Sequence, residues 1–565
     1  MQYHLTYIFY LLFFLFSIIG HGLLFRKLFI NKEINLNIGY TGIIGIFSIS
    51  LFSLASSYFI NHGYLHNLLL HGIGTIFFIN FLLKKKSVKE IKGILLIFFI
   101  FLVGIYIFKN HDDFPYYHLT YALNLVENKF IIGSGIFGHG YRTPSSLFFF
   151  HSTLYLPIIN FFLFNVGPFY ILIFFNFIIL KKIMKLIKKK PDIIFYLSLL
   201  IFSYVNIFFY RIAEHGVDKS PQILLFIIIL DIIILFSHYK KKLNFNILQK
   251  NTLLILTLIF FAASIKQIYF LYFLLIPLLY FKINFFKEIL NKNKLLIIIL
   301  FASLLLNQLT SFFSTGCFLY PEEKTCFEKK IDWAIPKSEV KELKTHYSWW
   351  AKSGNSINLK NQIPKNEYIN NLSWVNNWFD NYFLNKISDN IFGLLFLNII
   401  FILFFYTKKK QKTNNINFKY LLYILLGFLL VWFFKHPALR YGGYVLIALP
   451  ILIINSYFLT KFINSKKNIT KKTFLIVVIT IIIFNGRNID RIYNEIDIYK
   501  YPIFEKPFFR IKETNFYKVI SYNKLNIYAN NNDMCWSTPT PCTYNPNLIV
   551  KEKYGFYIVK RKKIK

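Results

Sequence analysis

Charged side chains are scarce in this sequence, and acidic ones are the scarcest. Only 16% of the 565 residues are charged, and the 26 Asp and Glu residues are outnumbered by 65 Lys and Arg residues. Hydrophobic residues make up 55% of the chain and aromatic residues 20%, and the mean hydropathy is +0.46. This composition excludes an ordinary soluble globular protein. We therefore predict a protein that crosses a membrane several times.

A nucleotide-binding glycine loop is also lacking, and the formal net charge of +39 does not indicate a nucleic-acid partner. The lysines occur in short runs between apolar stretches, at residues 84–86, 188–190, 240–242 and 408–410. Basic loops of this kind stay on the cytoplasmic side of a membrane. We therefore expect a membrane, and no nucleic acid, as the partner of these charges.

Runs of about 20 apolar residues predict membrane-crossing helices. No small-residue cleavage site follows the first run, so we expect a retained helix there rather than a secretion signal. The apolar stretch 145–166 is predicted to lie on or dip into the outer face, because a crossing there would place residues 188–190 outside. The other runs predict about fourteen crossing helices, at residues 4–25, 38–60, 64–83, 91–108, 168–187, 191–210, 222–238, 251–266, 267–281, 294–313, 389–406, 420–435, 442–461 and 472–485.

This topology divides the chain into an N-terminal helical extension (1–90), a membrane domain (91–485) and an outer C-terminal domain (486–565). The tail is more polar and has β-prone stretches between Asn- and Pro-rich turns. The predicted fold class is therefore an all-α polytopic membrane protein with a small α+β appendage. The outer segments are then residues 109–145, 211–221, 266–267, 314–388, 435–441 and the tail.

Only four cysteines are present, and all of them fall in these outer segments. Cys317 and Cys326 form one close pair, and Cys535 and Cys542 form the other. The spacing predicts two small disulfide loops in an oxidising compartment, each contributing about 2–3 kcal/mol. The alternative is four free thiols.

The first candidate site is His111-Asp112-Asp113, at the outer end of a hydrophobic span. Neighbouring carboxylates raise each other's pKa, and a nearby cation or metal restores their charge. Such a pair can act as a general base for an acceptor hydroxyl or amine, and Glu214 could join it in holding a divalent metal. The alternative is a solvated loop turn.

The second candidate site is the loop that contains Arg211, Glu214, His215 and Asp218. A simple connector between two helices needs none of these ionisable groups. Glu214 or Asp218 could supply a second acid, and Arg211 could bind a phosphate through its two-pronged guanidinium. The alternative is a network of surface salt bridges.

Only eight of the 65 basic residues are arginines, so an arginine in this chain indicates a need for a planar, permanent charge. Arg440 and Tyr441 lie on a short loop at headgroup height, where a lipid phosphate would sit. Lys266 and Arg142 are candidates of the same kind. Interfacial anchoring is the alternative for these cations. Five tryptophans in residues 316–388 fit an interfacial belt or a sugar-stacking surface.

Asp231 lies in the middle of a predicted span. A carboxylate at that depth is costly and is paired or functional by default. We assign it no catalytic role.

The order of these parts resembles the C-type glycosyltransferase superfamily over residues 91–461. The resemblance rests on the outer acidic motif after an early helix, the stretch 141–146 before an interfacial segment, Lys266 at a short turn, and the Arg440-Tyr441 loop before a helix that contains Pro450. It implies a fold of that type and transfer of a sugar from a polyprenyl-phosphate carrier. It also implies a catalytic base at Asp112 or Asp113 and, more weakly, a second acid at Glu214 or Asp218.

The chain departs from that superfamily in having three helices within residues 1–90, ahead of the helix that leads into the acidic loop, where many members have a single helix. Two local strings are similar to those of a family of bacterial multi-spanning membrane proteins with no assigned activity. These strings are Gly-Cys-Phe-Leu-Tyr-Pro at 316–321, followed by Asp332-Trp333, and Cys-Trp-Ser-Thr-Pro-Thr-Pro-Cys-Thr at 535–543.

The sequence and the resemblance together predict an inverting glycosyltransferase in a bacterial inner membrane, with its active face in the periplasm. Asp112 or Asp113 would deprotonate a cell-envelope acceptor, while Arg440, Arg211 and Lys266 would hold the lipid phosphate. One alternative is an O-antigen polymerase or ligase built around Arg440 or Arg142. Another is a lipid-linked glycan transporter or flippase, for which only Asp231 lies at the required depth.

Overall fold

A computed structural model describes most of the chain. The described residues are 2–30, 34, 36–84, 87–188, 191–214, 216–239, 245–282, 285–353, 364–370, 372–407, 418–462, 466–514, 518–530, 535–536 and 538–562. Parts of the basic runs used for the topology, and all of 240–242 and 408–410, lie outside these ranges.

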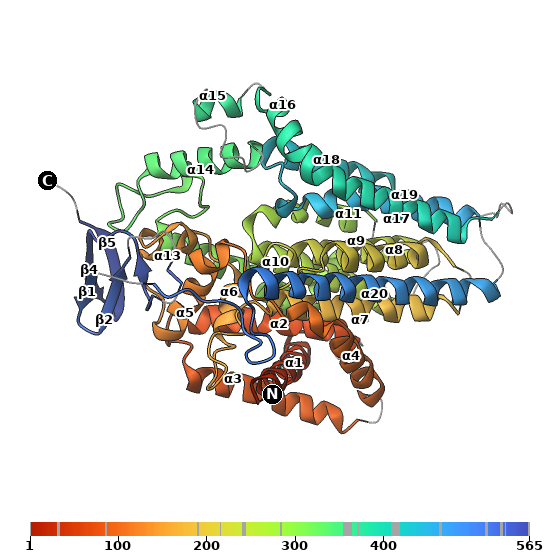
Figure 1. Cartoon of the computed structure of the whole chain (residues 1–565), viewed down its shortest axis with the longest axis horizontal. Coiled ribbons are helices and arrows are strands. Elements are labelled where there is room, and N and C mark those ends of the chain that lie inside the picture. Colours follow the sequence, from red (N-terminus) through yellow and green to blue (C-terminus); the bar gives the residue numbers. More distant parts are fainter. Residues whose placement is uncertain are drawn as a thin grey trace.

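Long helices make up most of the protein (Figure 1). Between them lie short helices, namely α5 (Leu119–Glu127), α6 (Ser146–Ser152), α11 (Ile276–Lys282), α12 (Phe286–Lys292), α15 (Lys365–Ile369) and α16 (Trp374–Trp378), and also α14 (Lys337–Lys352), which at 16 residues is as long as α8. The long helices are α1 (Gln2–Phe29), α2 (Ile38–Ser56), α3 (Tyr64–Leu82), α4 (Ser87–Phe101), α7 (Gly167–Leu186), α8 (Ile193–Phe208), α9 (Ser220–Tyr239), α10 (Phe245–Ile265), α13 (Lys294–Thr315), α17 (Ser388–Phe405), α18 (Lys419–Lys435), α19 (Gly443–Lys461) and α20 (Lys466–Tyr499).

The expected multi-pass membrane protein is confirmed at the level of its helices. Within the described residues, nine helices are long and apolar enough to cross a membrane, and a bent pair after Lys266 could add one more. The fourteen predicted crossings are not reached. Of the others, α8 has 16 residues, which at 1.5 Å per residue gives about 24 Å, less than the hydrocarbon thickness.

The apolar helices differ in how much of their surface is buried inside the protein. α9 is buried over 89% of its apolar window, whereas α3 and α20 are each buried over only 28%. A helix that is apolar all round belongs at the centre of a bundle or in lipid. α9 therefore forms the core, next to α7, α8 and α10, and α20 leaves much of its apolar surface for lipid.

The stretch 145–166 forms no long helix. α6 covers only Ser146–Ser152, all seven residues are buried, and turns lead on to α7. The segment thus dips into the protein and packs on α2, α5 and α10.

The C-terminal tail carries the expected strands. An antiparallel pair, β1 (Lys518–Tyr522) and β2 (Leu525–Ala529), is extended by the parallel β3 (Cys542–Thr543). β4 (Leu548–Lys553) and β5 (Phe556–Arg561) form a separate antiparallel pair. The predicted start of the tail at residue 486 falls inside a helix, because α20 continues to Tyr499.

The segments predicted to lie outside meet at one end of the bundle. Figure 1 shows the strands and α14 there, and the far ends of α17 and α19 at the other end. Arg142 pairs with Glu339, and Thr540 donates a hydrogen bond to Glu127. Both predicted disulfides, Cys317–Cys326 and Cys535–Cys542, are present.

Candidate functional site

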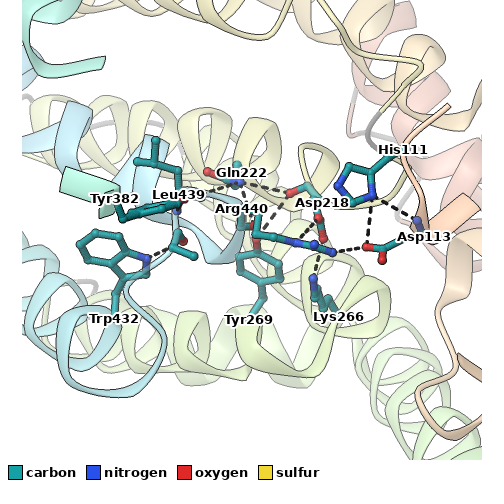
Figure 2. Close-up of polar contacts among 11 residues, drawn as sticks. His111, Asp113, Asp218, Gln222, Lys266, Tyr269, Tyr382, Trp432, Leu439 and Arg440 are labelled. Atoms are coloured by element: carbon teal, nitrogen blue, oxygen red, sulfur yellow. Dashed lines mark hydrogen bonds and ion pairs between the residues drawn. The ribbon is translucent and has the colours of Figure 1, made fainter. Parts of the chain in front are cut away.

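Four charged side chains from four loops that are far apart in the sequence meet in one place (Figure 2). Asp113 precedes the short π-helical turn η2 (Phe114–His118), and Asp218 lies two residues before α9. Lys266 follows α10 directly, and Arg440 lies in the turn η9 (Leu439–Tyr441) before α19. Each residue is at a helix end, so the bundle itself fixes their relative positions. We call these four residues the Arg440 cluster.

Arg440 bridges the two carboxylates. Its Nη2 donates to Oδ2 of Asp113, and its Nε lies 2.9 Å from Oδ2 of Asp218. Lys266 Nζ donates to the other oxygen of Asp218, Oδ1, at 2.5 Å. Two cations therefore face two carboxylates in the Arg440 cluster. Their side chains are only 12–25% exposed, so the pairing offsets much of the cost of removing the charges from water.

Burial and pairing act in opposite directions on these groups. Burial raises the pKa of Asp113, but Arg440, His111 and His118 outweigh it and hold the pKa below its ordinary value. For Asp218 burial is again opposed, by Arg440 and Lys266, and the pKa is strongly lowered. Both side chains are therefore ionised carboxylates at neutral pH.

The loop that carries Arg440 is held by hydrogen bonds to its backbone (Figure 2). Gln222 of α9 donates to the carbonyl of Arg440 at 3.3 Å, and Tyr382 accepts from the N–H of Leu439 at 2.8 Å. Trp432 donates to the carbonyl of Ala438 at 2.9 Å. These contacts hold the backbone of the loop in place and leave the N–H groups of the guanidinium for the two carboxylates.

Aromatic rings line the two cations. Lys266 Nζ lies 4.6 Å from the ring centre of Tyr441, and Arg440 Cζ lies 5.5 Å from the same ring. Trp350 of α14 is 5.8 Å from Arg440 Cζ. The tryptophan-rich segment thus reaches the Arg440 cluster through the partly buried ring of Trp350.

A family model described as a domain of unknown function, DUF8201, matches residues 1–447. The chain belongs to the DUF8201 family. The match includes residues 1–90 and every member of the Arg440 cluster. Comparison with curated proteins found no match, and neither did comparison with solved structures.

In this DUF8201 protein, the acidic loop next to Asp113 divides into an inward and an outward part. His111 Nδ1 accepts from the N–H of Asp113 at 3.2 Å, and the N–H of His111 donates to the carbonyl of Glu214 at 3.3 Å. Asp112 has an exposed side chain. Of the two predicted bases, Asp113 is the one in contact with Arg440.

The second predicted loop also divides, because Asp218 joins the Arg440 cluster and Glu214 does not. The carboxylate of Glu214 accepts two hydrogen bonds from Arg211. His215 lies outside the described residues. Glu214 and Arg211 thus form a salt bridge, which is the kind of contact that the alternative interpretation of this loop predicts.

His118 is a residue of the site that the sequence analysis did not select. It is 7% exposed, its Nε2 has no hydrogen-bond partner, and its ring packs against Gly216, where a Cβ would lie 2.3 Å from His118 Cε1. Burial, opposed by Asp113 and Asp218, lowers the pKa of His118 to about 4. It is a neutral imidazole beside two carboxylates, and nothing in its sequence context distinguishes it from a core histidine.

Arg142 lies in another buried contact set. It is 2% exposed and donates to the carbonyl of Gly135, to Tyr320 and to Glu339. Its guanidinium thus links the loop between α5 and α6 to α14.

The predicted metal ligands do not meet. Asp113 pairs with Arg440 and Glu214 with Arg211, and Asp112 is exposed. Among the described residues, no group of three or more Asp, Glu, His and Cys side chains is placed to hold a metal ion.

Asp231 is paired within the bundle. Tyr40 of α2 donates to its two oxygens at 2.8 and 2.6 Å, and Lys182 of α7 forms a salt bridge with it. The buried carboxylate links three helices, as expected for a charge at that depth.

Proposed function

We propose that this protein is a membrane glycosyltransferase that moves a sugar from a polyprenyl-phosphate-linked donor to a cell-envelope acceptor. The proposed location is a bacterial inner membrane, with the Arg440 cluster facing the periplasm. The observation that carries the proposal is the meeting of Asp113, Asp218, Lys266 and Arg440 at the end of the bundle that also holds the disulfides. Disulfides persist in the periplasm and not in the cytosol.

Asp113 is the proposed base. Its carboxylate contacts one cation, Arg440, whereas Asp218 contacts two. An acceptor hydroxyl would attack the anomeric carbon of the sugar while its proton passes to Asp113. The bond between that carbon and the phosphate oxygen breaks, and its electron pair leaves with the carrier phosphate, so that the configuration at the carbon inverts.

Protonation of Asp113 also changes the contacts of Arg440. Asp113 holds Arg440 while it is ionised, and its hold weakens once it is protonated. Arg440 can then turn its charge to the departing phosphate, at the moment when negative charge develops there. Asp218 and the hydrogen-bonded loop backbone keep Arg440 in place throughout.

The test is sugar transfer by purified protein in lipid nanodiscs, with a pool of polyprenyl-phosphate sugars as donors and mass spectrometry of the products. Asp113→Asn should lower transfer at least tenfold, equivalent to about 1.4 kcal/mol of barrier. Asp112→Asn should lower it no more than about twofold, because that side chain lies outside the cluster. Full transfer by both Asp113→Asn and the Asp112→Asn, Asp113→Asn double variant would refute the assignment.

The position of Arg440 also favours a second candidate, an O-antigen polymerase or ligase that uses a lipid-diphosphate glycan. Arg440 contacts both carboxylates and lies beside Trp350. In that mechanism arginine, and not a carboxylate, provides the essential group. Arg440→Gln would then abolish product formation while Asp113→Asn retained it, with chain length of the lipid-linked glycan as the readout.

A further inference from the structure

A second group of cations lies where the end of α8, the start of α9 and the outer part of α20 meet. It consists of Arg211, Lys219, Arg487 and Arg491, and we call it the Arg491 cluster. Lys219 donates to the carbonyl of Arg211 at 3.1 Å, and Arg487 donates to the carbonyl of Ile207 at 2.7 Å. Three of the eight arginines of the chain are thus gathered in one place.

Arg491 is buried yet incompletely satisfied. Its side chain is 7% exposed, with Nη2 donating to the carbonyl of Tyr106 and Nη1 lying 3.4 Å from a carboxylate oxygen of Glu495. Its Nε is buried without a hydrogen-bond partner. A buried donor without a partner is costly and is uncommon in native proteins. An anion at this place would supply the missing acceptor.

The charges of the Arg491 cluster do not balance. Two carboxylates, Glu214 and Glu495, face four cations, whereas the Arg440 cluster has two of each. Burial lowers the pKa of Lys219 to about 7; Glu214 opposes this shift, and Arg211, Arg487 and Arg491 add to it. Lys219 is therefore only partly protonated at neutral pH, and the three arginines give the cluster its excess of positive charge over the two carboxylates.

The open side of the cluster continues into a lipid-facing surface. Arg487 is exposed, and a Cβ added at Gly486 would have no neighbour within 4 Å. One to four turns earlier on α20, apolar side chains are 41–71% exposed, namely Phe474, Leu475, Ile479 and Ile482. Ile482 lies about 7.5 Å from Arg487 along the helix axis but about 140° around it, whereas Ile479 lies about 12 Å along the axis and about 80° around it. An apolar chain lying past Ile479 would bring a phosphate at its end within reach of the long side chain of Arg487.

We propose that the Arg491 cluster binds the phosphate group of a lipid whose apolar chain lies along α20. Asp218 and Lys219 are consecutive residues that face the Arg440 cluster and the Arg491 cluster respectively. If the proposed function holds, this lipid is the sugar carrier, and the phosphate is held beside the reacting groups. Arg440 and Lys266, already paired with carboxylates, are then left to act in the transition state.

The test is binding of a polyprenyl phosphate to the full-length protein in detergent, measured by native mass spectrometry and by thermal shift. Polyprenol without the phosphate, inorganic phosphate and phosphatidylglycerol are the comparison ligands. Arg487→Gln changes an exposed side chain, and Arg491→Gln changes a buried one. Arg510→Gln is the matched control, because Arg510 is also an exposed arginine. Its backbone N–H donates to the carbonyl of Phe108, two residues from the Tyr106 carbonyl that Arg491 binds.

We expect Arg487→Gln and Arg491→Gln each to weaken polyprenyl-phosphate binding about tenfold, as for loss of one charged hydrogen bond, with Arg510→Gln unchanged. Equal competition by inorganic phosphate would identify the phosphate alone as the ligand, and equal competition by phosphatidylglycerol would identify an ordinary anionic lipid headgroup; either result would overturn the carrier assignment. Equal binding of polyprenol, or no loss in Arg487→Gln, would overturn the site. Asp113→Asn should bind polyprenyl phosphate as the wild-type protein does. A loss of sugar transfer in that variant is therefore distinguishable from a loss of lipid binding at the Arg491 cluster.

Discussion

Removing one carboxylate from the Arg440 cluster should destabilise the protein, and removing its partner cation as well should restore part of the loss. Asp218→Asn leaves Arg440 and Lys266, which are 22% and 25% exposed, facing one carboxylate instead of two. Breaking a fully buried pair costs about 3–5 kcal/mol, and the remaining exposure here reduces the expected loss to about 2–3 kcal/mol. Adding Lys266→Gln returns the cluster to one cation and one carboxylate.

The assay is thermal unfolding followed by tryptophan fluorescence in detergent. The Asp218→Asn, Lys266→Gln double variant should be more stable than the sum of the single effects predicts, with a coupling of at least about 1 kcal/mol. Glu288→Gln is the control, because Glu288 and Lys292 form an exposed pair on α12, with side chains 45% and 55% exposed. Additive effects of Asp218→Asn and Lys266→Gln would refute the description of the cluster as a coupled unit.

Three further predictions concern pH and redox state. The pKa values of Asp113 and Asp218 are lowered in the folded protein, so the stability that these two carboxylates contribute is complete above about pH 5 and is lost as the pH falls below about 4. The Tm of Asp218→Asn should therefore fall less steeply below pH 4 than that of the wild-type protein. An equal fall of Tm in both proteins would contradict this. The pKa of His118 is about 4 in the folded protein, below that of an unfolded histidine, so the protein should lose stability as the pH falls from about 6.5 to 4. In His118→Phe the Tm should depend less on pH in that range. An equal dependence in both proteins would exclude a contribution from His118. Reduction should lower the Tm through loss of about 2–3 kcal/mol for each disulfide, and a variant with all four cysteines changed to serine should not respond to reductant; a response of that variant would point to another cause.

Asp113, Asp218, Lys266 and Arg440 each border a helix in the structure. In the predicted topology an even number of crossings separates them, so we expected all four at the same membrane face. Within a loop, the position of the helix ends does not fix the direction of a side chain. Gly216, with φ of +54°, lies between Glu214 and Asp218, and the two carboxylates enter different clusters. Likewise, Asp112 and Asp113 are equivalent in the sequence, and only the packed loop separates them.

The lengths of the helices were harder to predict than their presence. The apolar run at 472–485 ends shortly before Arg487 and Arg491, but α20 continues past both residues to Tyr499. Helix formation does not require apolar residues, and Arg491 and Glu495 form an i,i+4 pair that suits a helix. The Arg491 cluster was missed for the same reason, because its two halves lie in a loop and in a helix beyond the predicted membrane region.

The most direct test of the account is a comparison of envelope glycans from cells that produce the wild-type protein, the Asp113→Asn variant, the Glu288→Gln control or no protein. Mass spectrometry should detect a sugar addition that requires the wild-type or control protein and is reduced at least tenfold by Asp113→Asn, with equal amounts of each protein in the membrane. Identical glycans in all four samples, or full addition by Asp113→Asn, would contradict a transferase centred on the Arg440 cluster.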